Sequence, residues 1–208
     1  RRGKILLSGP GKIAMSPNGH GGILLDLIEE ESLAAYRAAG IRYLFYFQVD
    51  NPLVRIADPV FLGHHIRNQS EVSIKSVQKV DPDEKVGVIC LVNGVLEVVE
   101  HTELCEEDRR RLAEDGSLLI STANTGIHAF SMDFLTRMRD EAVQLPFHAV
   151  ERATPCWTRG KVVRAMKPNS VKFSLFIFDA IRKASRANLL EVERADEFSP
   201  IKCCSGPS

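Results

Sequence analysis

One carboxylate, Asp50, stands at a position where chemistry is expected. It directly follows residues 41–49, an aromatic and β-branched stretch that predicts a buried strand. A carboxylate at the end of such a strand is costly unless it is paired or binds a metal ion. Mg²⁺ prefers one or two carboxylates together with phosphate oxygens and water. Asp50 is therefore a candidate Mg²⁺ ligand, and an Asx turn or helix cap is the alternative that fits the same spacing.

A glycine-rich loop, residues 17–22, precedes a predicted helix. Gly19, Gly21 and Gly22 would allow backbone N–H groups to approach a ligand, and the start of a helix favours anions. The loop is neither a Walker A motif nor a dinucleotide fingerprint, because no G-K-[ST] follows and G-x-G-x-x-G is absent. By itself this signal favours an ordinary turn that begins a helix.

Three further groups are weaker candidates. Glu97 and Glu100 lie in a predicted hairpin strand, where a carboxylate could accept hydrogen bonds from sugar hydroxyls but more often faces solvent. Lys172 lies beside three phenylalanines whose spacing is more typical of a core than of a stacking platform. These phenylalanines are Phe173, Phe176 and Phe178. Lys202 lies in an irregular run, where a lone lysine is usually solvated.

The histidines and cysteines do not indicate a metal site. His64 and His65 are neighbours on a predicted helix, so their side chains would point in different directions. Neither H-E-x-x-H nor C-x-x-C occurs. The five cysteines have irregular spacing, which indicates reduced thiols and a cytoplasmic protein.

The charge balance bounds the classes of partner. The 27 Lys and Arg residues equal the 27 Asp and Glu residues, so no overall field attracts nucleic acid or an acidic membrane. The apolar and charged fractions, 44% and 26%, are those of a soluble globular protein. No apolar run has the length of a bilayer span. Any anion-binding site must therefore be local, and a homo-oligomer is compatible with this composition.

Helical and strand patterns alternate along the chain, which predicts an α/β fold. The predicted helices cover residues 24–39, 58–68, 103–114 and 131–143. The predicted strands cover residues 41–49, 72–80, 86–92, 95–99, 118–122 and 189–193, and residues 171–187 open as a strand and continue as a helix from 176. Asp58-Pro59 marks a helix start and Asn93-Gly94 marks a hairpin turn. In open α/β sheets ligands bind at the carboxyl ends of strands, which is where Asp50 lies.

Six segments, taken in order, resemble a known family. They are SPNGHGG, QVDNPLVRIADPVFLG, VGVICLVNGVLEVVE, ANTGIHAF, KPNSVKFSLFIFD and ERADEFSPIK. Together they resemble the UDP-N-acetylglucosamine pyrophosphorylases within the UDP-sugar pyrophosphorylase family, over nearly the whole chain. The resemblance implies an α/β, Rossmann-like nucleotidyltransferase (GT-A-like) core with a mixed β-sheet flanked by helices.

The same resemblance implies roles at the nucleotide and phosphates. Gly19 and His20 would lie against the uracil and ribose. Asp50 would hold Mg²⁺ beside the phosphates, Lys202 would reach the phosphates, and Lys172 would assist. The family's usual Asp-Gly-Asn is Asn18-Gly19-His20 here. Histidine at that place also occurs in the related UDP-glucose enzymes.

For the sugar, the resemblance implies a second set of contacts. Gly87 would let the sugar approach the backbone, and Glu100 would bond its hydroxyls. Asn124 would contact the sugar and its N-acetyl group, and Phe176 and Phe178 would wall the pocket near that acetyl group.

The expected activity follows from this resemblance. UTP and N-acetylglucosamine 1-phosphate would give UDP-N-acetylglucosamine and pyrophosphate, with Mg²⁺ as cofactor and with neither nucleic acid nor membrane as partner. The alternatives are the same chemistry on glucose or galactose 1-phosphate, or a non-catalytic UDP-sugar-binding protein. The family's N-terminal G-G-x-G-T-R-L-G loop, which cradles the UTP phosphates, does not occur. Residues 1–208 are therefore expected to be the central and C-terminal part of the catalytic domain.

Overall fold

The computed structural model describes residues 3–201, which divide into two compact units. Unit 1 comprises residues 3–27 and 144–177, and unit 2 comprises residues 28–143 and 178–201. None of the helices formed by these residues combines the length and the apolar character of a membrane span.

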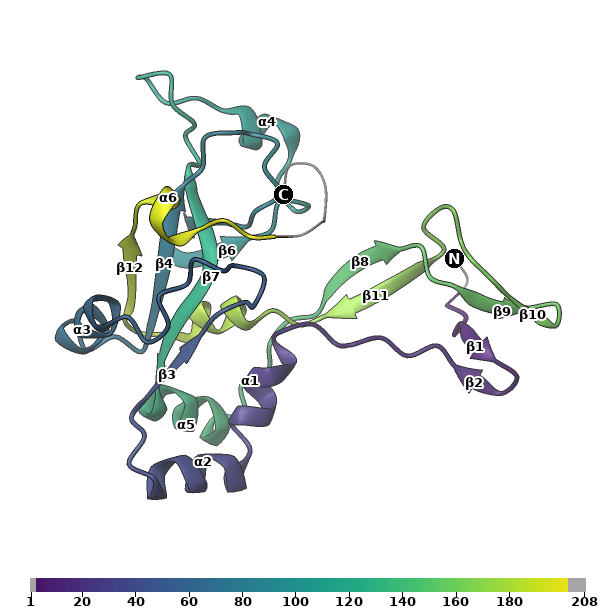
Figure 1. Cartoon of the computed structure of the whole chain (residues 1–208), viewed down its shortest axis with the longest axis horizontal. Helices are drawn as coiled ribbons and strands as arrows, with labels where there is room; N and C mark the ends of the chain where they lie inside the picture. Colours follow the sequence, from purple (N-terminus) through teal and green to yellow (C-terminus); the bar gives the residue numbers. More distant parts are fainter. Residues whose placement is uncertain (1–2, 202–208) are drawn as a thin grey trace. The chain divides into compact units, whose positions relative to one another are not determined.

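Unit 2 is built on a mixed β-sheet in the order β12-β4-β7-β5-β6, with β3 also paired to β7 (Figure 1). β12 (Ala187–Glu191) runs parallel to β4 (Val72–Gln78), and the other pairs are antiparallel. The remaining strands are β3 (Tyr43–Tyr46), β5 (Val88–Val92), β6 (Val95–Val99) and β7 (Thr122–Ser131). β7 is the centre of the sheet, because it pairs with β4 along one edge and with β3 and β5 at different positions of the other.

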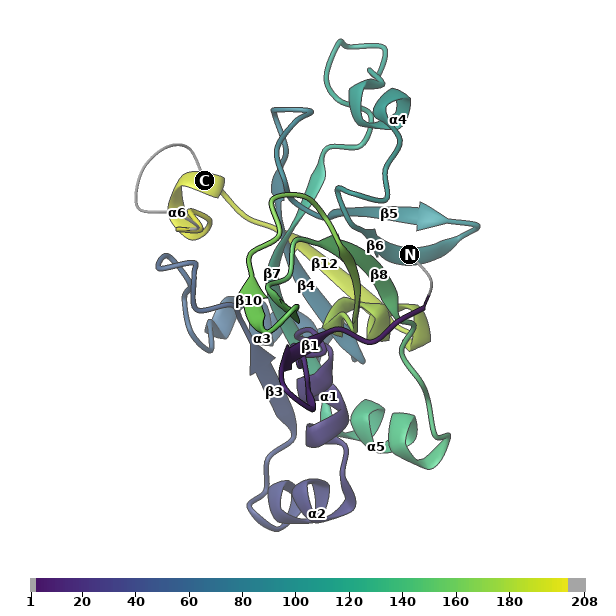
Figure 2. The same ribbon diagram turned by 90° about the vertical axis from the view of Figure 1, so that its right-hand side faces the viewer.

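Helices pack on this sheet through apolar side chains. The α-helices of unit 2 are α2 (Glu30–Ala38), α3 (Pro59–Arg67), α4 (Glu106–Arg110), α5 (Met132–Asp140) and α6 (Arg194–Glu197). Phe61 of α3 forms a buried cluster with Ile127 and Ala129 of β7. α2 and α5 lie side by side in both views (Figures 1 and 2), where the Arg37 guanidinium donates to Thr136 Oγ1 at 2.9 Å. A 3₁₀-helix, Ile177–Lys183, begins at the last residue of unit 1.

Unit 1 consists of short antiparallel strand pairs and one helix. β1 (Leu7–Gly9) pairs with β2 (Lys12–Ile13), β9 (Cys156–Thr158) with β10 (Lys161–Val163), and β8 (His148–Arg152) with β11 (Ser170–Ser174). The helix is α1 (Gly22–Leu27), which follows the glycine-rich loop.

Most of the predicted elements of unit 2 are present, and the α/β class is confirmed. The predicted helices at 58–68 and 131–143 correspond to α3 and α5, and the strands at 72–80 and 189–193 correspond to β4 and β12. The Asp58 carboxylate accepts the Val60 N–H at 3.0 Å, so it caps α3 as expected. Asn93 and Gly94 have φ of +53° and +80° in the β5–β6 turn, as the hairpin prediction requires.

The prediction of one helix over residues 24–39 is wrong. The chain forms α1 and then α2, and Glu29 between them is extended with ψ of 144°. The break places Glu30 and Glu31 in the first turn of α2, where negative side chains interact favourably with the helix dipole. The end of α2 is as predicted, because Gly40 follows it with φ of +72°.

The prediction of a short strand at 118–122 is also wrong, since the central strand β7 occupies 122–131 instead. The polar residues of β7 do not resemble a buried strand in the sequence, but their hydrogen bonds are made inside the sheet. Thr125 Oγ1 donates to the Lys75 carbonyl at 2.7 Å, for example. The predicted helix 103–114 shortens to α4, because Arg111 after it is already extended. The strands β1, β2, β8, β9 and β10 and helix α6 were not predicted.

Gly94→Ala is expected to lower the free energy of unfolding by about 1 kcal/mol, because a Cβ at φ of +80° is strained even though it meets no atom within 4 Å. Gly63→Ala is the matched control. Gly63 lies within α3, where an added Cβ also meets nothing, so alanine should raise stability by about 0.5–1 kcal/mol. Urea unfolding measures both variants. Effects of the same sign would contradict the hairpin geometry.

Candidate active site

The strands β3, β4 and β12 run in the same direction. β3 and β4 both pair antiparallel with β7, and β12 is parallel to β4. Their carboxyl ends therefore lie at one edge of the sheet, which is the edge where open α/β sheets bind ligands. Asp50 follows β3 at this edge, and the chain that follows β12 forms α6 and reaches Ile201.

Asp50 is half-buried at this edge. Among residues 3–201, no hydrogen bond or ion pair to its carboxylate is found, while its backbone carbonyl accepts the Ile201 N–H at 2.8 Å. Burial raises the pKa of the nearby Tyr46 hydroxyl, a hydrogen bond with Gln48 opposes this, and the charge of Asp50 adds to the increase. The Asp50 carboxylate is thus placed for a ligand that the described residues do not supply.

The structure brings Gly87, Glu100 and Asn124 together. The Asn124 N–H donates to the Gly87 carbonyl at 2.8 Å. A Cβ built on Gly87 would lie 3.3 Å from Glu100 Oε1 and 3.0 Å from Val98 Cγ1. The absence of a side chain at Gly87 therefore leaves a backbone surface open beside the Glu100 carboxylate.

The Asn124 side chain is oriented by its own strand. Its Oδ1 accepts the Gly126 N–H at 3.1 Å and lies 3.3 Å from His128 Nε2. Its Nδ2 makes no hydrogen bond with the residues that the structure describes. Asn124 therefore offers a donor, which suits a carbonyl or hydroxyl oxygen of a ligand.

In unit 1 the glycine-rich loop packs against the segment after β11. The Leu175 N–H donates to the Asn18 carbonyl at 2.6 Å, and the Gly21 N–H donates to the Leu175 carbonyl at 2.8 Å. A Cβ on Gly19 would lie 2.4 Å from the Leu175 carbonyl oxygen, and one on Gly21 would lie 2.7 Å from the Phe176 nitrogen. Only glycine permits this approach.

His20 forms an aromatic stack in the same unit. The centre of its ring lies 5.2 Å from that of the Phe176 ring at an interplanar angle of 20°, and the centre of the His148 ring lies 4.4 Å from that of Phe176. The Ile177 N–H donates to His20 Nδ1 at 3.2 Å, so this nitrogen is an acceptor. Burial, with a smaller contribution from His148, lowers the pKa of His20 to about 4. His20 is consequently a neutral ring at physiological pH.

The remaining predicted residues are Lys172, Phe178 and Lys202. Lys172 is half-buried on β11 and lines a separate pocket of about 970 Å³ with Met15 and Phe173. Phe178 is 3% exposed in unit 2. Lys202 lies outside the described residues.

Asp50 suits a divalent cation whose other ligands come from phosphate and water. Within residues 3–201, no group of three or more His, Cys, Asp or Glu side chains could enclose a metal ion. Mg²⁺ commonly binds through one carboxylate, phosphate oxygens and water. The lone Asp50 carboxylate matches that coordination and does not match an all-protein site.

Sequence reasoning missed Asn51 and Lys75. Asn51 is buried next to Asp50, and Lys75 is buried in the middle of β4. The signal available for Asn51 is an amide that directly follows a candidate metal ligand in the sequence. Lys75 gave no such signal, because its carboxylate partners are remote in sequence.

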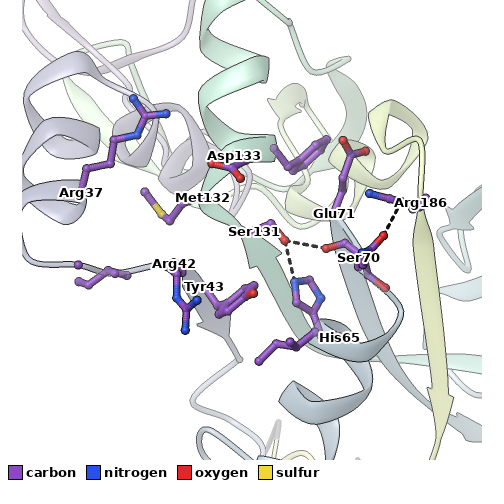
Figure 3. A pocket seen from close by; sticks show the side chains of 15 residues that line it. Arg37, Arg42, Tyr43, His65, Ser70, Glu71, Ser131, Met132, Asp133 and Arg186 are labelled. Carbon is purple, nitrogen blue, oxygen red and sulfur yellow. Dashed lines mark hydrogen bonds between the residues drawn. The ribbon is translucent and has the colours of Figure 1, made fainter.

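A pocket of about 640 Å³ lies at the opposite edge of the sheet, around the start of β3 and the end of β7 (Figure 3). In its wall Ser131 Oγ donates to the Ser70 carbonyl at 2.6 Å and lies 2.9 Å from His65 Nε2. His65 Nε2 is therefore the donor to Ser131, and His65 Nδ1 accepts from Ser73 Oγ at 2.7 Å. Its place at the amino ends of the strands distinguishes this pocket from the candidate active site.

The fold is of the nucleotidyltransferase type found in UDP-sugar pyrophosphorylases. The UDP-N-acetylglucosamine pyrophosphorylase of Trypanosoma brucei, solved in complex with an inhibitor, superposes with a TM-score of 0.82 at 27% identity, covering 100% of this chain and 42% of that chain. A UDP-glucose pyrophosphorylase mutant from Leishmania major gives 0.72 at 20% identity, covering 96% and 45%, which is a likeness of fold alone.

Residues 7–206 match the family model described as UTP–glucose-1-phosphate uridylyltransferase, and the chain belongs to this family. The human UDP-N-acetylhexosamine pyrophosphorylase-like protein 1 is 39% identical over 202 residues, which are 96% of this chain and 40% of that protein. The UDP-N-acetylglucosamine pyrophosphorylase of Saccharomyces cerevisiae is 33% identical over 207 residues, 97% of this chain and 43% of that protein. The resemblance in the six segments is confirmed, and the chain spans about 40% of the length of these curated relatives.

Gly19→Ala is expected to destabilise unit 1 more than Gly11→Ala. Both glycines have positive φ, +93° and +65°, but a Cβ meets the Leu175 backbone at Gly19 and open space at Gly11. The difference between the variants isolates the steric cost of the close approach, about 1–3 kcal/mol. Thermal unfolding of both variants measures it, and equal losses would show that the loop does not need this contact.

The stability of unit 2 should depend on His65. Burial lowers the pKa of His65 from 6.5 to about 4, so the folded state favours the neutral ring. The resulting stabilisation is complete above pH 6.5 and is lost as the pH falls toward 4. Urea unfolding measures the free energy of unfolding at pH 7 and at pH 4.5. Between these two pH values the wild type should lose more of it than His65→Gln does. An unchanged pH dependence in the variant would rule out this contribution.

Proposed function

We propose that this chain contributes to a uridylyltransferase that makes UDP-N-acetylglucosamine and pyrophosphate from UTP and N-acetylglucosamine 1-phosphate. One observation carries the proposal: the carboxyl edge of the sheet presents the Asp50 carboxylate, without a partner among residues 3–201, in the same unit as the Gly87, Glu100 and Asn124 cluster. Membership of the family and the names of the relatives support the assignment of the substrates.

The chemistry requires positioning more than proton transfer. A phosphate oxygen of the sugar phosphate attacks the α-phosphorus of UTP, the bond from that phosphorus to the bridging oxygen breaks, and pyrophosphate leaves. The nucleophile is already largely ionised at pH 7, because the second pKa of a phosphate monoester is about 6. No general base is needed, and rate comes from alignment and charge neutralisation.

Asp50 would hold Mg²⁺, which when bound would neutralise charge on the phosphate oxygens. Lys202 and Lys172 would contact the same phosphates. The Asp50 carboxylate is suited to this role because it is half-buried and its oxygens accept no hydrogen bond from the described residues.

One set of residues would contact the nucleotide and a second set would contact the sugar. His20 would present a neutral ring beside the uracil and ribose, since burial keeps it uncharged, and Gly19 would lie against them. The Asn124 Nδ2 donor would bind the acetamide carbonyl or a hydroxyl, and Glu100 would accept from sugar hydroxyls beside Gly87. Phe176 and Phe178 would wall the acetyl group.

Pyrophosphate release is the test, on the longest gene product that contains this chain, with UTP, Mg²⁺ and either N-acetylglucosamine 1-phosphate or glucose 1-phosphate. The wild type should prefer the N-acetylated substrate. Asp50→Asn should lower kcat by about 10²–10³-fold, the scale of removing one electrostatic contact to the reacting group. Asp133→Asn is the matched control, since Asp133 is an exposed carboxylate at the opposite edge of the sheet.

The alternatives give different results. Preference for glucose or galactose 1-phosphate would retain the chemistry and overturn the role of Asn124. UDP-sugar binding without turnover would indicate the non-catalytic alternative. An Asp50→Asn variant as active as Asp133→Asn would remove Asp50 from the mechanism.

A further inference from the structure

The turn after β3 is fastened to the segment after α6 by the side chain of Asn51. This side chain is 4% exposed. Its Nδ2 donates to the Glu197 carbonyl at 2.8 Å, and its Oδ1 accepts the Ser199 N–H at 3.0 Å. The Asp50 carbonyl accepts the Ile201 N–H at 2.8 Å. The two hydrogen bonds of the Asn51 side chain join segments that lie 146 and 148 residues apart in the sequence.

Glu197 is itself anchored to strand β4 of the sheet. Its carboxylate and that of Asp58 both hydrogen-bond the Lys75 ammonium, which is fully buried on β4. Arg55 Nε approaches the second Glu197 oxygen at 3.9 Å. The Glu197 side chain thereby fixes α6, a helix of only four residues. It also holds the Glu197 carbonyl in the position where it accepts from Asn51 Nδ2.

The chemistry of this contact requires an amide. The Glu197 carbonyl needs a donor and the Ser199 N–H needs an acceptor. An amide of this length provides the two on separate atoms of one side chain. A carboxylate would lack the donor and would add a charge next to Asp50. A truncated side chain would leave the Glu197 carbonyl unsatisfied in a buried place, which costs more than the hydrogen bond contributes.

We propose that Asn51 is a positioning residue, which holds the Asp50 carboxylate in the orientation needed to bind a divalent cation together with the uridine diphosphate group. The inference rests on the proposed function, because it assigns Asn51 a role in the same site. Asn51 does not contact the cation in this scheme. It fixes the turn between the end of β3 and Leu53, whose N–H approaches Asn51 Oδ1 at 3.4 Å.

The test compares Asn51→Ala with the wild type in the longest gene product that contains this chain. Electron paramagnetic resonance of Mn²⁺ titrated in the presence of UDP measures cation affinity without turnover. Steady-state kinetics give kcat and the KM for sugar 1-phosphate. We expect Mn²⁺ affinity and kcat each to fall by about tenfold, the scale of leaving buried polar groups unpaired, while that KM changes by less than about threefold. Asn51→Ser serves in the same way if Asn51→Ala does not fold.

Thr136→Val is the control for a purely structural effect. Thr136 is also buried, accepts from Arg37 at 2.9 Å and donates to the Met132 carbonyl at 2.8 Å, but it lies on α5. It should lose stability without changing Mn²⁺ affinity. Wild-type Mn²⁺ affinity in Asn51→Ala, or an equal loss in Thr136→Val, would overturn the inference alone. A wild type that neither binds UDP nor turns over would instead overturn the proposed function, and the inference with it.

Discussion

Lys75 lies in the middle of β4 with its ammonium group fully buried between the carboxylates of Asp58 and Glu197. Burial raises the pKa of Asp58, but the hydrogen bonds from Lys75 and from the Val60 N–H outweigh it and hold the pKa below its usual value. Removing any one member of this group would leave a buried charge without its partner, which is strongly destabilising. The cluster therefore ties the start of α3 and the short helix α6 to the same strand.

The candidate active site depends on that anchoring. Asp50 follows β3, whereas Glu197 and Ile201 follow β12. These two strands are not neighbours in the sheet, because β3 pairs with β7 and β12 pairs with β4. The hydrogen bonds of Asn51 and of the Asp50 carbonyl bring the two chain segments together at the carboxyl edge. Hydrogen bonds thus hold these segments at the edge where open α/β sheets bind ligands. Because hydrogen bonds are directional, they define the positions of the segments more closely than apolar contacts would.

The candidate groups of the two units offer different kinds of polar contact. Burial keeps His20 uncharged against Phe176, and the Asn124 amide presents a donor whose orientation is set by Gly126. Asp50 and Glu100 supply the carboxylates. The proposed reaction between two phosphate groups would use such contacts, because the charges already reside on the substrates and the protein would have to orient and neutralise them.

The sequence by itself determined the local elements and the chemical inventory. Asp58-Pro59 fixed the start of α3, Asn93-Gly94 fixed the β5–β6 turn, and Asp50 was placed at the end of its strand, because capping, positive φ and strand termination are governed by neighbouring residues. The six segments in order pointed to the family. The proximity of Gly87, Glu100 and Asn124 required the folded sheet, although the resemblance had assigned each of them to the sugar.

Only the tertiary structure decided the central strand β7, the break between α1 and α2, and the role of Asn51 and Lys75. β7 has polar residues such as Thr125 that look unlike a buried strand until their partners on β4 are known. Lys75 and Asn51 find their partners 122 and 146 residues away in Glu197. A buried polar side chain is stable only with its partner, and the sequence carries no local record of a partner that folding brings from so far along the chain.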